Sequence, residues 1–331
     1  MYLCTMMDPY SIFDIKNFSE FEDKALAVFR HQAEHVKVYR DFVELMKVNP
    51  KNVSNLHEIP FLPIRFFKQY SIIENKLQPE KIFTSSGTTS QNTSKHLVAD
   101  LALYHHSLSK CFHHFYGDLS EYCIFALLPS YLERTGSSLI DMVEYWTQQA
   151  DASFGGFYLY NHDELHRDLL ACEKAGKKAI LIGVSFALLD FVEKYSMQLS
   201  QTIIMETGGM KGRKKEITRQ ELHSILQQGF GTQHIHSEYG MTELLSQAYM
   251  REQAVFETPN WMHLLIRETE DPLTFVEEGK TGGVNVIDLA NFHSCSFIAT
   301  DDLGRKKSSQ TFEILGRFDH SDVRGCNLLV V

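Results

Sequence analysis

A run of small and hydroxylated side chains stands out in residues 81–95, which read KIFTSSGTTSQNTSK. A loop of this composition can turn its backbone N–H groups and its hydroxyl groups toward one anion, as phosphate-binding loops do. The segment is not a Walker motif, because the GxxxxGK[ST] spacing is absent. The alternative interpretation is an ordinary polar surface loop. The candidate phosphate ligands are Thr84, Ser85, Ser86, Gly87, Thr88 and Thr89.

A second candidate site is SEYGMTELLSQ, residues 237–247, which follows the strand-like QHIHS. Tyr239 offers a flat ring for a base, and Gly240 completes a Tyr-Gly turn. Thr242 offers a hydroxyl for a phosphate, and Glu243 offers a hard carboxylate for magnesium. The residues after this motif follow a helical pattern, so we expect a strand, a turn and then a helix. The alternative is a plain turn.

Two further segments carry chemistry of the same kind. ETGGMKGR contains Gly208 and Gly209, which permit close approach of a planar ligand to the backbone. ATDDLGR contains Asp302, whose carboxylate can accept both hydroxyls of a ribose, and Arg317 downstream can brace the sugar or a phosphate. Either charged residue could equally lie on a solvated turn.

The elements that must position these residues alternate between apolar strand patterns and helical patterns. The strand candidates are YCIFALLP, KKAILIGV, QTIIMETGG and QHIHSEYG, with SLIDMVEYWTQQA, FALLDFVEKYSM and RQELHSILQQGF as helices between them. Such alternation predicts an α/β fold with a parallel sheet flanked by helices, and ligands bind at the carboxyl ends of its strands. We expect one domain over 1–331, with a helical segment and connector (1–75), an α/β core (76–255) and a smaller β-rich closing region (256–331).

Composition excludes several classes of protein. The sequence is 44% hydrophobic and 22% charged, which is typical of a globular protein, and its net charge of -10 gives no docking surface for nucleic acid. The N-terminus lacks the pattern of a signal peptide, and the longest apolar stretch, AILIGVSFALL, is shorter than the about 20 residues of a membrane span. We therefore expect a cytoplasmic protein without a membrane span. The widely separated cysteines predict free thiols.

The four motifs in their order, TSSGTTS, EYGMTE, TDDLGR and GRFD, resemble those of the adenylate-forming superfamily, which includes acyl-CoA ligases, aryl-CoA ligases and luciferases. The resemblance implies that ATP activates a carboxylic acid as an acyl-adenylate with release of pyrophosphate. It implies that residues 84–89 cover the phosphates and that the adenine site is formed by Gly208, Gly209 and Tyr239. It also implies that Thr242 meets the α-phosphate, Glu243 meets Mg²⁺, and Asp302 meets the ribose beside Arg317.

Members of that superfamily normally continue past the Gly-Arg-x-Asp hinge into a mobile lid that carries a catalytic lysine. The printed sequence ends at Val331, so we expect the lid to be missing. Another cation must then steady the charge that develops during adenylation. Lys211 and Arg213 are the candidates, with Arg305 next.

The chain also resembles, over essentially its whole length, the LuxE-type acyl-protein synthetases of the bacterial fatty-acid reductase complex. The shared segments are the IPFLPIRFFK connector, SSGTT, ETGGMKGR and the ending with Arg-Gly-Cys. This resemblance implies transfer of a fatty acyl group to Cys326 and then to a partner reductase. A thiolate is a good nucleophile toward an acyl-adenylate, and Arg324 could lower the pKa of the Cys326 thiol. The alternative for Cys326 is a small buried residue in a terminal strand.

Two other functions remain open at this point. AILIGVSFALLDF approximates the nucleophile elbow of an α/β-hydrolase, with Ser185 on the turn, although a strand-to-helix turn with a capping serine accounts for it better. An adenylation fold could also serve as a non-catalytic scaffold. The sequence does not identify the acid.

Overall fold

The computed structural model describes residues 7–85, 93–129, 135–208, 217–252 and 254–318 of the 331. Its helices are α1 (Phe18–His35), α2 (Lys37–Leu45), α3 (Phe66–Gln69), α4 (Leu101–Tyr116), α6 (Ser138–Gln149), α7 (His162–Lys174), α8 (Ser185–Lys194) and α9 (Arg219–Phe230). Short 3-10 helices are η1 (Pro9–Asp14), η2 (Leu56–Glu58), η3 (Leu119–Glu121) and η4 (Leu289–Asn291). The first seven strands are β1 (Leu62–Pro63), β2 (Lys81–Thr84), β3 (Lys95–Val98), β4 (Tyr122–Leu127), β5 (Gly156–Tyr158), β6 (Lys178–Val184) and β7 (Thr202–Thr207). The others are β8 (Ile235–Tyr239), β9 (Ala248–Met250), β10 (Phe256–Glu257), β11 (Met262–Arg267), β12 (Thr281–Asp288), β13 (Phe297–Lys306) and β14 (Thr311–Arg317).

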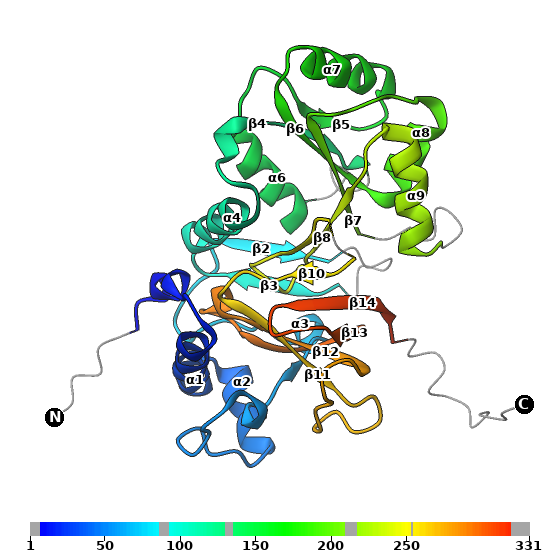
Figure 1. The fold of residues 1–331 in the computed structure, drawn as a ribbon. Helices are drawn as coiled ribbons and strands as arrows, with labels where there is room; N and C mark the ends of the chain where they lie inside the picture. The colour runs from blue at the N-terminus through cyan, green and yellow to red at the C-terminus, as the bar shows by residue number, and fades with distance from the viewer. Residues whose placement is uncertain (1–6, 86–92, 130–134, 209–216, 253, 319–331) are drawn as a thin grey trace, which may run out of the picture.

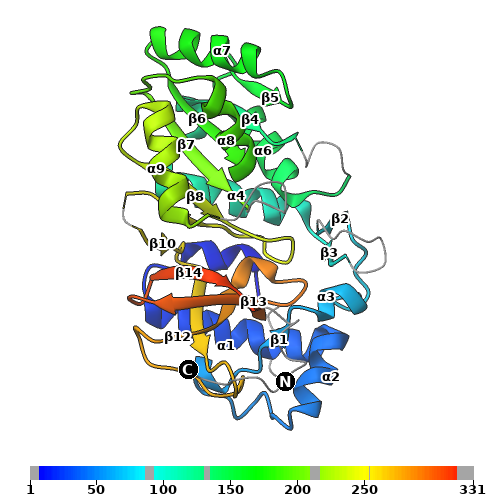
Figure 2. The same ribbon diagram turned by 90° about the vertical axis from the view of Figure 1, so that its right-hand side faces the viewer.

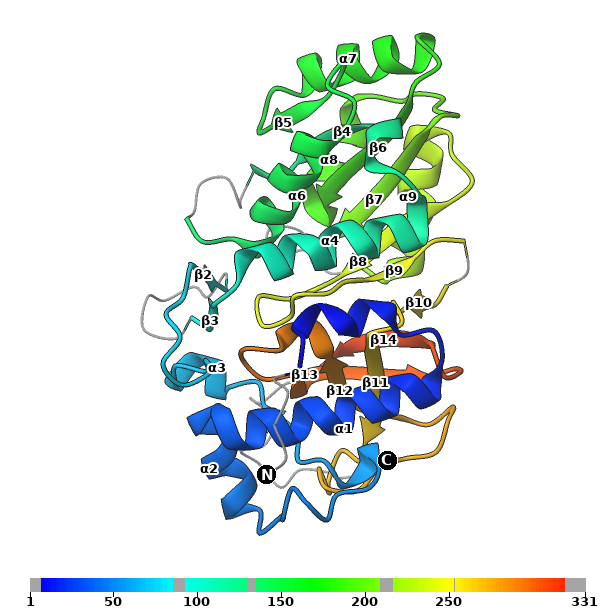
Figure 3. The ribbon, with the colours of Figure 1, turned by 90° about the vertical axis from the view of Figure 1, so that its left-hand side faces the viewer.

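A long mixed sheet runs through the described part of the chain, in the order β11-β12-β13-β14-β10-β9-β8-β7-β6-β4-β5. Strands β5, β4, β6, β7 and β8 pair in parallel, and helices α4 and α6 cover one face while α8 and α9 cover the other (Figures 1 and 3). The burial of β4 and β6 is nearly complete, as expected for strands covered on both faces. The prediction of a parallel α/β core is confirmed.

The β-rich closing region begins where the chain reverses after β8. Strand β9 pairs antiparallel with β8, and β11 to β14 form an antiparallel part of the same sheet (Figure 2). Helix α1 lies across this part of the sheet (Figure 3). It begins after the Asn17 cap and buries an apolar stripe that includes Phe21, Ala25 and Phe29.

The connector IPFLPIRFFK joins this region from far away in the sequence. Leu62 and Pro63 of β1 pair in parallel with Ile298 and Ala299 of β13. Asp302 lies further along the same strand. Helix α3 follows directly, and its Phe67 ring packs on His96 of β3 with centroids 5.5 Å apart. The connector therefore ties the hairpin β2–β3 to the strand β13.

Across the described ranges, none of the helices combines the length and the apolar character that a bilayer crossing requires.

Candidate functional site

Three of the sequence-predicted residues meet where β8 and the β13–β14 pair approach each other. The hydroxyl of Tyr239, at the end of β8, donates a hydrogen bond of 2.8 Å to Oδ2 of Asp302. The other carboxylate oxygen of Asp302 lies 3.1 Å from Nε of Arg317. Asp302 and Arg317 are direct neighbours in the β13–β14 register, so the sheet itself sets this ion pair.

The electrostatics of this trio leave room for a ligand. Burial raises the pKa of Asp302, and the charge of Arg317 opposes that shift. Burial and the Asp302 carboxylate together raise the pKa of Tyr239, so the phenol keeps its proton and remains a donor. Each oxygen of a carboxylate can accept a second hydrogen bond, so Asp302 can still accept from two hydroxyls. The side chain of Arg317 is 69% exposed and open to an anion.

The turn that carries Thr242 and Glu243 differs from the expected helix start. Residues 242–246 form turns and bends, and the chain then enters β9. The N–H of Leu245 donates to Oδ2 of Asp288 (2.9 Å) and to Oδ1 of Asn291 (3.1 Å), and the Glu243 carbonyl accepts from Asn291 (2.8 Å). Because distant side chains take these backbone groups, the helical hydrogen bonds cannot form, and the prediction of a helix here is wrong.

Glu243 is a buried carboxyl group whose charge a cation could neutralise. Burial raises its pKa, while a hydrogen bond with Ser94 and the charges of Arg317 and Lys68 lower it. A bound cation would remove the cost of burying this charge. No cluster of three acidic, histidine or cysteine ligands occurs within the described ranges. Mg²⁺ commonly takes one or two carboxylates and completes its coordination with phosphates and water.

The hydroxyl-rich loop leaves the antiparallel hairpin β2–β3. Thr84 donates its N–H to the carbonyl of Gly136 at 2.7 Å, which fixes the end of β2. Ser85 pairs with Ser94 on the other arm, because its N–H donates to the Ser94 carbonyl (3.0 Å) and its hydroxyl accepts from the Ser94 N–H (2.9 Å). The other predicted ligands, Ser86, Gly87, Thr88 and Thr89, lie outside the described residues.

The end of β7 is held by Ser185. Gly208 has a φ of 67°, a left-handed conformation that favours glycine, and its carbonyl accepts a 2.7 Å hydrogen bond from the Ser185 hydroxyl. Oγ of Ser185 also lies 3.1 Å from Glu206, and only 2% of the residue is exposed. The expected capping role is wrong, because Ser185 is the first residue of α8 and its side chain caps nothing. A buried serine whose two partners are oxygens also does not fit a hydrolase nucleophile.

Gly240 is fixed by its neighbour Glu238. A Cβ at Gly240 would lie 2.3 Å from Oε1 of Glu238, so a side chain here would force the buried carboxylate to move. Glu238 is already held by the hydroxyl of Thr207, the residue opposite it on β7. The exposed Gly240 backbone is thus open to a ligand directly beside Tyr239.

Other predicted residues are not brought to this site or lie outside the described residues. Both Nε and Nη2 of Arg305 bond Oε2 of Glu313 across the β13–β14 pair, at 2.8 and 2.6 Å, so this guanidinium is already neutralised. Those that fall outside the described part of the chain are Gly209, Lys211, Arg213, Arg324 and Cys326.

Sequence reasoning missed the residues that hold the site turn from behind. They are His96, Asp288 and Asn291, none of which belongs to a motif. Asp288 looks like an ordinary cap, and it does cap η4 by accepting from the Ala290 N–H. Only the meeting of distant segments shows the second role, so the sequence carried no signal for it.

Solved structures with the same fold include a CoA ligase and two ATP-bound proteins. A 2-hydroxyisobutyryl-CoA ligase in complex with 2-HIB-AMP and CoA superposes with a TM-score of 0.67 at 14% identity, covering 96% of this chain and 73% of that one. ATP-bound MatB from Rhodopseudomonas palustris gives a TM-score of 0.53 at 15% identity, covering 71% of this chain and 47% of that one. An ATP-bound RpMatB-BxBclM chimera gives 0.54 at 14% identity with the same coverage, so the chain spans about half of its length. These likenesses show the adenylate-forming fold.

Family membership comes from the sequence comparison. No curated protein matches the chain. The family model described as "Acyl-protein synthetase, LuxE" matches residues 5–331, which include every segment of the site described above. The chain therefore belongs to the LuxE acyl-protein synthetase family.

Proposed function

We propose that the protein uses ATP to activate a carboxylic acid, a long-chain fatty acid in particular, and then transfers the acyl group to a protein thiol. The observation that carries this proposal is the contact of Tyr239, Asp302 and Arg317, which come from β8, β13 and β14. Three residues that match separate motifs of one superfamily meet at one point beside the Glu243 turn. Membership of the acyl-protein synthetase family supports the same reaction.

In the first step, a carboxylate oxygen of the acid attacks the α-phosphorus of ATP. The bond from that phosphorus to the bridging oxygen of the β-phosphate breaks, and pyrophosphate leaves. The product is an acyl-adenylate, a mixed anhydride. Charge builds up on the α-phosphate during this step, and fixed positive groups and donors that stabilise it lower the barrier.

The residues of the site have distinct tasks in this proposal. Asp302 accepts the ribose hydroxyls, and the Tyr239 hydroxyl holds Asp302 in place by its hydrogen bond. Arg317 stays near the sugar and phosphate, since it pairs with Asp302 and its side chain is exposed. Thr242 donates to the α-phosphate, and the loop from Thr84 to Thr89 covers the other phosphates. Gly208, Gly209 and Tyr239 form the adenine site, and the glycines let the base approach the backbone.

Glu243 would hold Mg²⁺, and the cation would neutralise phosphate charge. Lys211 and Arg213 remain proposals for the cation that steadies the reacting groups. Arg305 is a weaker candidate, because its guanidinium already pairs with Glu313.

In the second step, the thiolate of Cys326 attacks the acyl carbon of the adenylate. The bond from the acyl carbon to the phosphate oxygen breaks, AMP leaves, and a thioester forms on the protein. The thiol proton passes to solvent. A partner protein that reduces or transfers acyl groups would then take the acyl group from Cys326. In this proposal residues 1–331 form a single adenylate-forming domain.

Intact-mass measurement tests both steps. The protein is incubated with ATP, Mg²⁺ and each of a panel of fatty and aryl acids. We expect a mass increase equal to one acyl group for fatty acids, absent in Cys326→Ser and retained in Cys4→Ser, a matched change near the other terminus. Cys326→Ser should still release pyrophosphate. Acylation that survives Cys326→Ser would remove the thiol role, and absence of both acylation and pyrophosphate release would favour a non-catalytic scaffold.

A further inference from the structure

The backbone of the Thr242–Ser246 turn is held by side chains from two distant parts of the sequence. Nδ1 of His96, on β3, lies 3.0 Å from the carbonyl oxygen of Thr242. Asn291, in η4, donates to the Glu243 carbonyl at 2.8 Å and accepts from the Leu245 N–H at 3.1 Å. The conformation of the turn therefore depends on β3 and on the η4 loop rather than on its own sequence.

The chemistry of the partners fixes the protonation of His96. Burial lowers the pKa of this fully buried histidine to about 4, so the ring is neutral at pH 7. The Thr242 carbonyl can only accept, which places the single proton on Nδ1. Nε2 must then accept, and the hydroxyl of Ser294 lies 2.8 Å away as its donor. Both ring nitrogens are thus used in one defined orientation.

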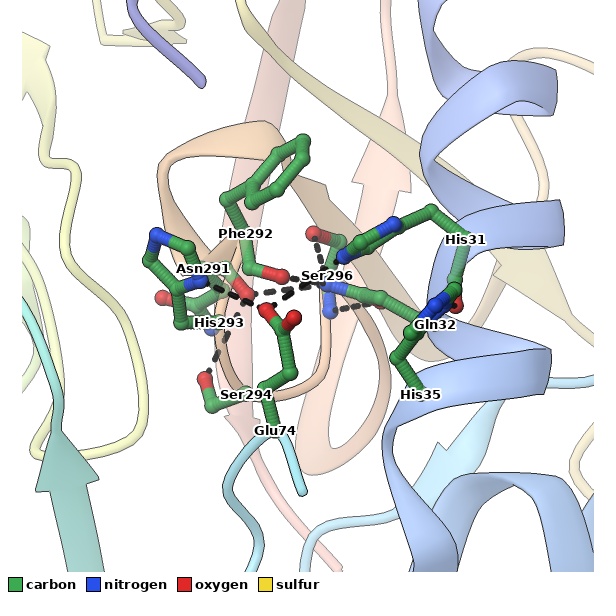
Figure 4. Close-up of polar contacts among 9 residues, drawn as sticks. All are labelled: His31, Gln32, His35, Glu74, Asn291, Phe292, His293, Ser294 and Ser296. Carbon is green, nitrogen blue, oxygen red and sulfur yellow. Dashed lines mark hydrogen bonds and ion pairs between the residues drawn. The ribbon is translucent and has the colours of Figure 1, made fainter. Parts of the chain in front are cut away.

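Helix α1 anchors the η4 loop from the side opposite the turn. Gln32 is fully buried, and its amide nitrogen donates to the carbonyls of Asn291 and Phe292, both at 2.9 Å (Figure 4). Its amide oxygen accepts from the Ser296 N–H at 3.0 Å. At the rim of the loop, the Glu74 carboxylate lies within hydrogen-bond distance of Nδ1 of His293, at 2.7 Å (Figure 4). Asn291, which bonds the turn, and Ser294, which bonds His96, therefore lie in a loop that other side chains hold in place.

Strand β3 also leads back from the hydroxyl-rich loop. Ser94 closes that loop through its bonds to Ser85, and the Ser94 side chain bonds the Glu243 carboxylate. His96 is two residues further on, so its side chain lies on the same face of the strand. One strand therefore contacts both the carboxylate of Glu243 and the backbone of Thr242.

We propose that His96 is a positioning residue of the nucleotide site, which holds the Thr242–Glu243 peptide beside Ser94 and the β2–β3 hairpin through the Thr242 carbonyl. The Thr242 hydroxyl and the Glu243 carboxylate then reach the phosphates and their cation from a preorganised turn. The identity of that ligand rests on the proposed function above, whereas the hold on the turn does not.

Two substitutions separate the contacts of His96. In His96→Asn, the side-chain amide can still donate to the Thr242 carbonyl, whereas in His96→Gln the longer side chain reaches toward Ser294 and leaves that carbonyl without its donor. We expect His96→Asn to keep the KM for MgATP within about threefold of wild type. We expect His96→Gln to raise it about tenfold, the size of effect for one lost hydrogen bond. Both are assayed at a temperature where the protein is folded.

His263→Asn is the matched control. His263 is also buried and neutral, with a pKa lowered by burial to about 3, but it packs against Phe18 and Phe21 instead of the turn. It should lose thermal stability without a change in KM. If His96→Gln behaves in the same way, His96 is only a core residue and the proposal is wrong.

Hydrogen exchange of the ligand-free protein tests the hold on the turn without any reaction. The amides of residues 243–246 should exchange about tenfold faster in His96→Gln than in wild type, and at the wild-type rate in His96→Asn and His263→Asn. Equal exchange in all four proteins would overturn the proposal. Faster exchange in His96→Gln, in a protein whose wild type shows no response to MgATP, would uphold the positioning role and contradict the proposed function instead.

Discussion

At the scale of single residues, Glu238 shows how the fold sets a charge state. Its carboxyl group is buried at the end of β8. Burial raises its pKa to about 7, the Thr207 hydroxyl opposes the shift, and the charge of Glu206 adds to it. The group therefore titrates near neutral pH, directly beside Gly240.

This shift predicts how stability depends on pH. The folded pKa of about 7 lies above the ordinary value of 4.5, so the folded state keeps a proton that the unfolded chain has lost. Stability falls as the pH rises through that window, by about 3 kcal/mol at 1.36 kcal/mol per unit. Glu238→Gln should therefore be more stable than wild type at pH 8 by up to about 3 kcal/mol, and the difference should vanish below pH 4.5.

Urea denaturation at pH 5 and pH 8 measures the effect. Glu277→Gln, at an exposed position, should follow the wild-type pH profile. If the free energy of unfolding changes equally between pH 5 and pH 8 in wild type and in Glu238→Gln, the pKa of the Glu238 carboxyl group is not raised in the folded protein.

A second residue-scale prediction concerns Tyr239, Asp302 and Arg317, the trio that we propose binds the ribose. Tyr239→Phe removes the donor to Asp302 but keeps the ring, so the affinity for MgATP should fall about fivefold to tenfold, as for one hydrogen bond. Asp302→Asn should lower the affinity further, because an amide cannot accept at both ends and loses the pairing with Arg317.

Titration calorimetry with MgATP gives the affinities. Tyr70→Phe, whose residue is 50% exposed, is the control and should bind as wild type does. Unchanged affinity in Asp302→Asn would exclude this aspartate from the nucleotide site.

At the scale of elements, the turn between β8 and β9 decides what the motif can do. Its local sequence favours a helix, but Asp288 accepts hydrogen bonds from the N–H groups of Leu245 and Ser246 and from the Ser246 hydroxyl. A pattern within one segment does not contain such contacts, because they depend on a strand more than forty residues later. The motif therefore indicated which residues to consider for the site, whereas it did not predict the conformation of the turn.

Asp288→Asn tests the strength of this support. The carboxylate accepts four hydrogen bonds while fully buried, and an amide would turn two hydrogens toward groups that also donate. We expect a loss of about 2–4 kcal/mol in the free energy of unfolding. Asp271→Asn, on an exposed loop with its own side-chain hydrogen bonds, should change stability little. A loss at Asp288 no larger than at Asp271 would contradict the account of the turn.

At the scale of the whole molecule, the sequence predicted the parallel half better than the antiparallel half. Strands β4, β6 and β7 each contain a buried apolar run, and helices on both faces of the sheet require that pattern. The pairing of β1 with β13 joins Leu62 to Ile298, and no local pattern contains that information. The contact of Asp302 with Tyr239 has the same origin, so only the order of the motifs indicated it.

The central claim is that this fold forms an acyl-adenylate at the site of Tyr239, Asp302 and Arg317. Acid-dependent exchange of labelled pyrophosphate into ATP measures that step directly, before any thiol is involved. The account predicts exchange that requires Mg²⁺ and a fatty acid and that persists in Cys326→Ser. The exchange should fall at least about a hundredfold in Asp302→Ala, because that change removes the contacts with Tyr239, Arg317 and the ribose at once. Exchange that is absent from the folded wild-type protein with every acid tested, or that is unchanged in Asp302→Ala, would contradict it.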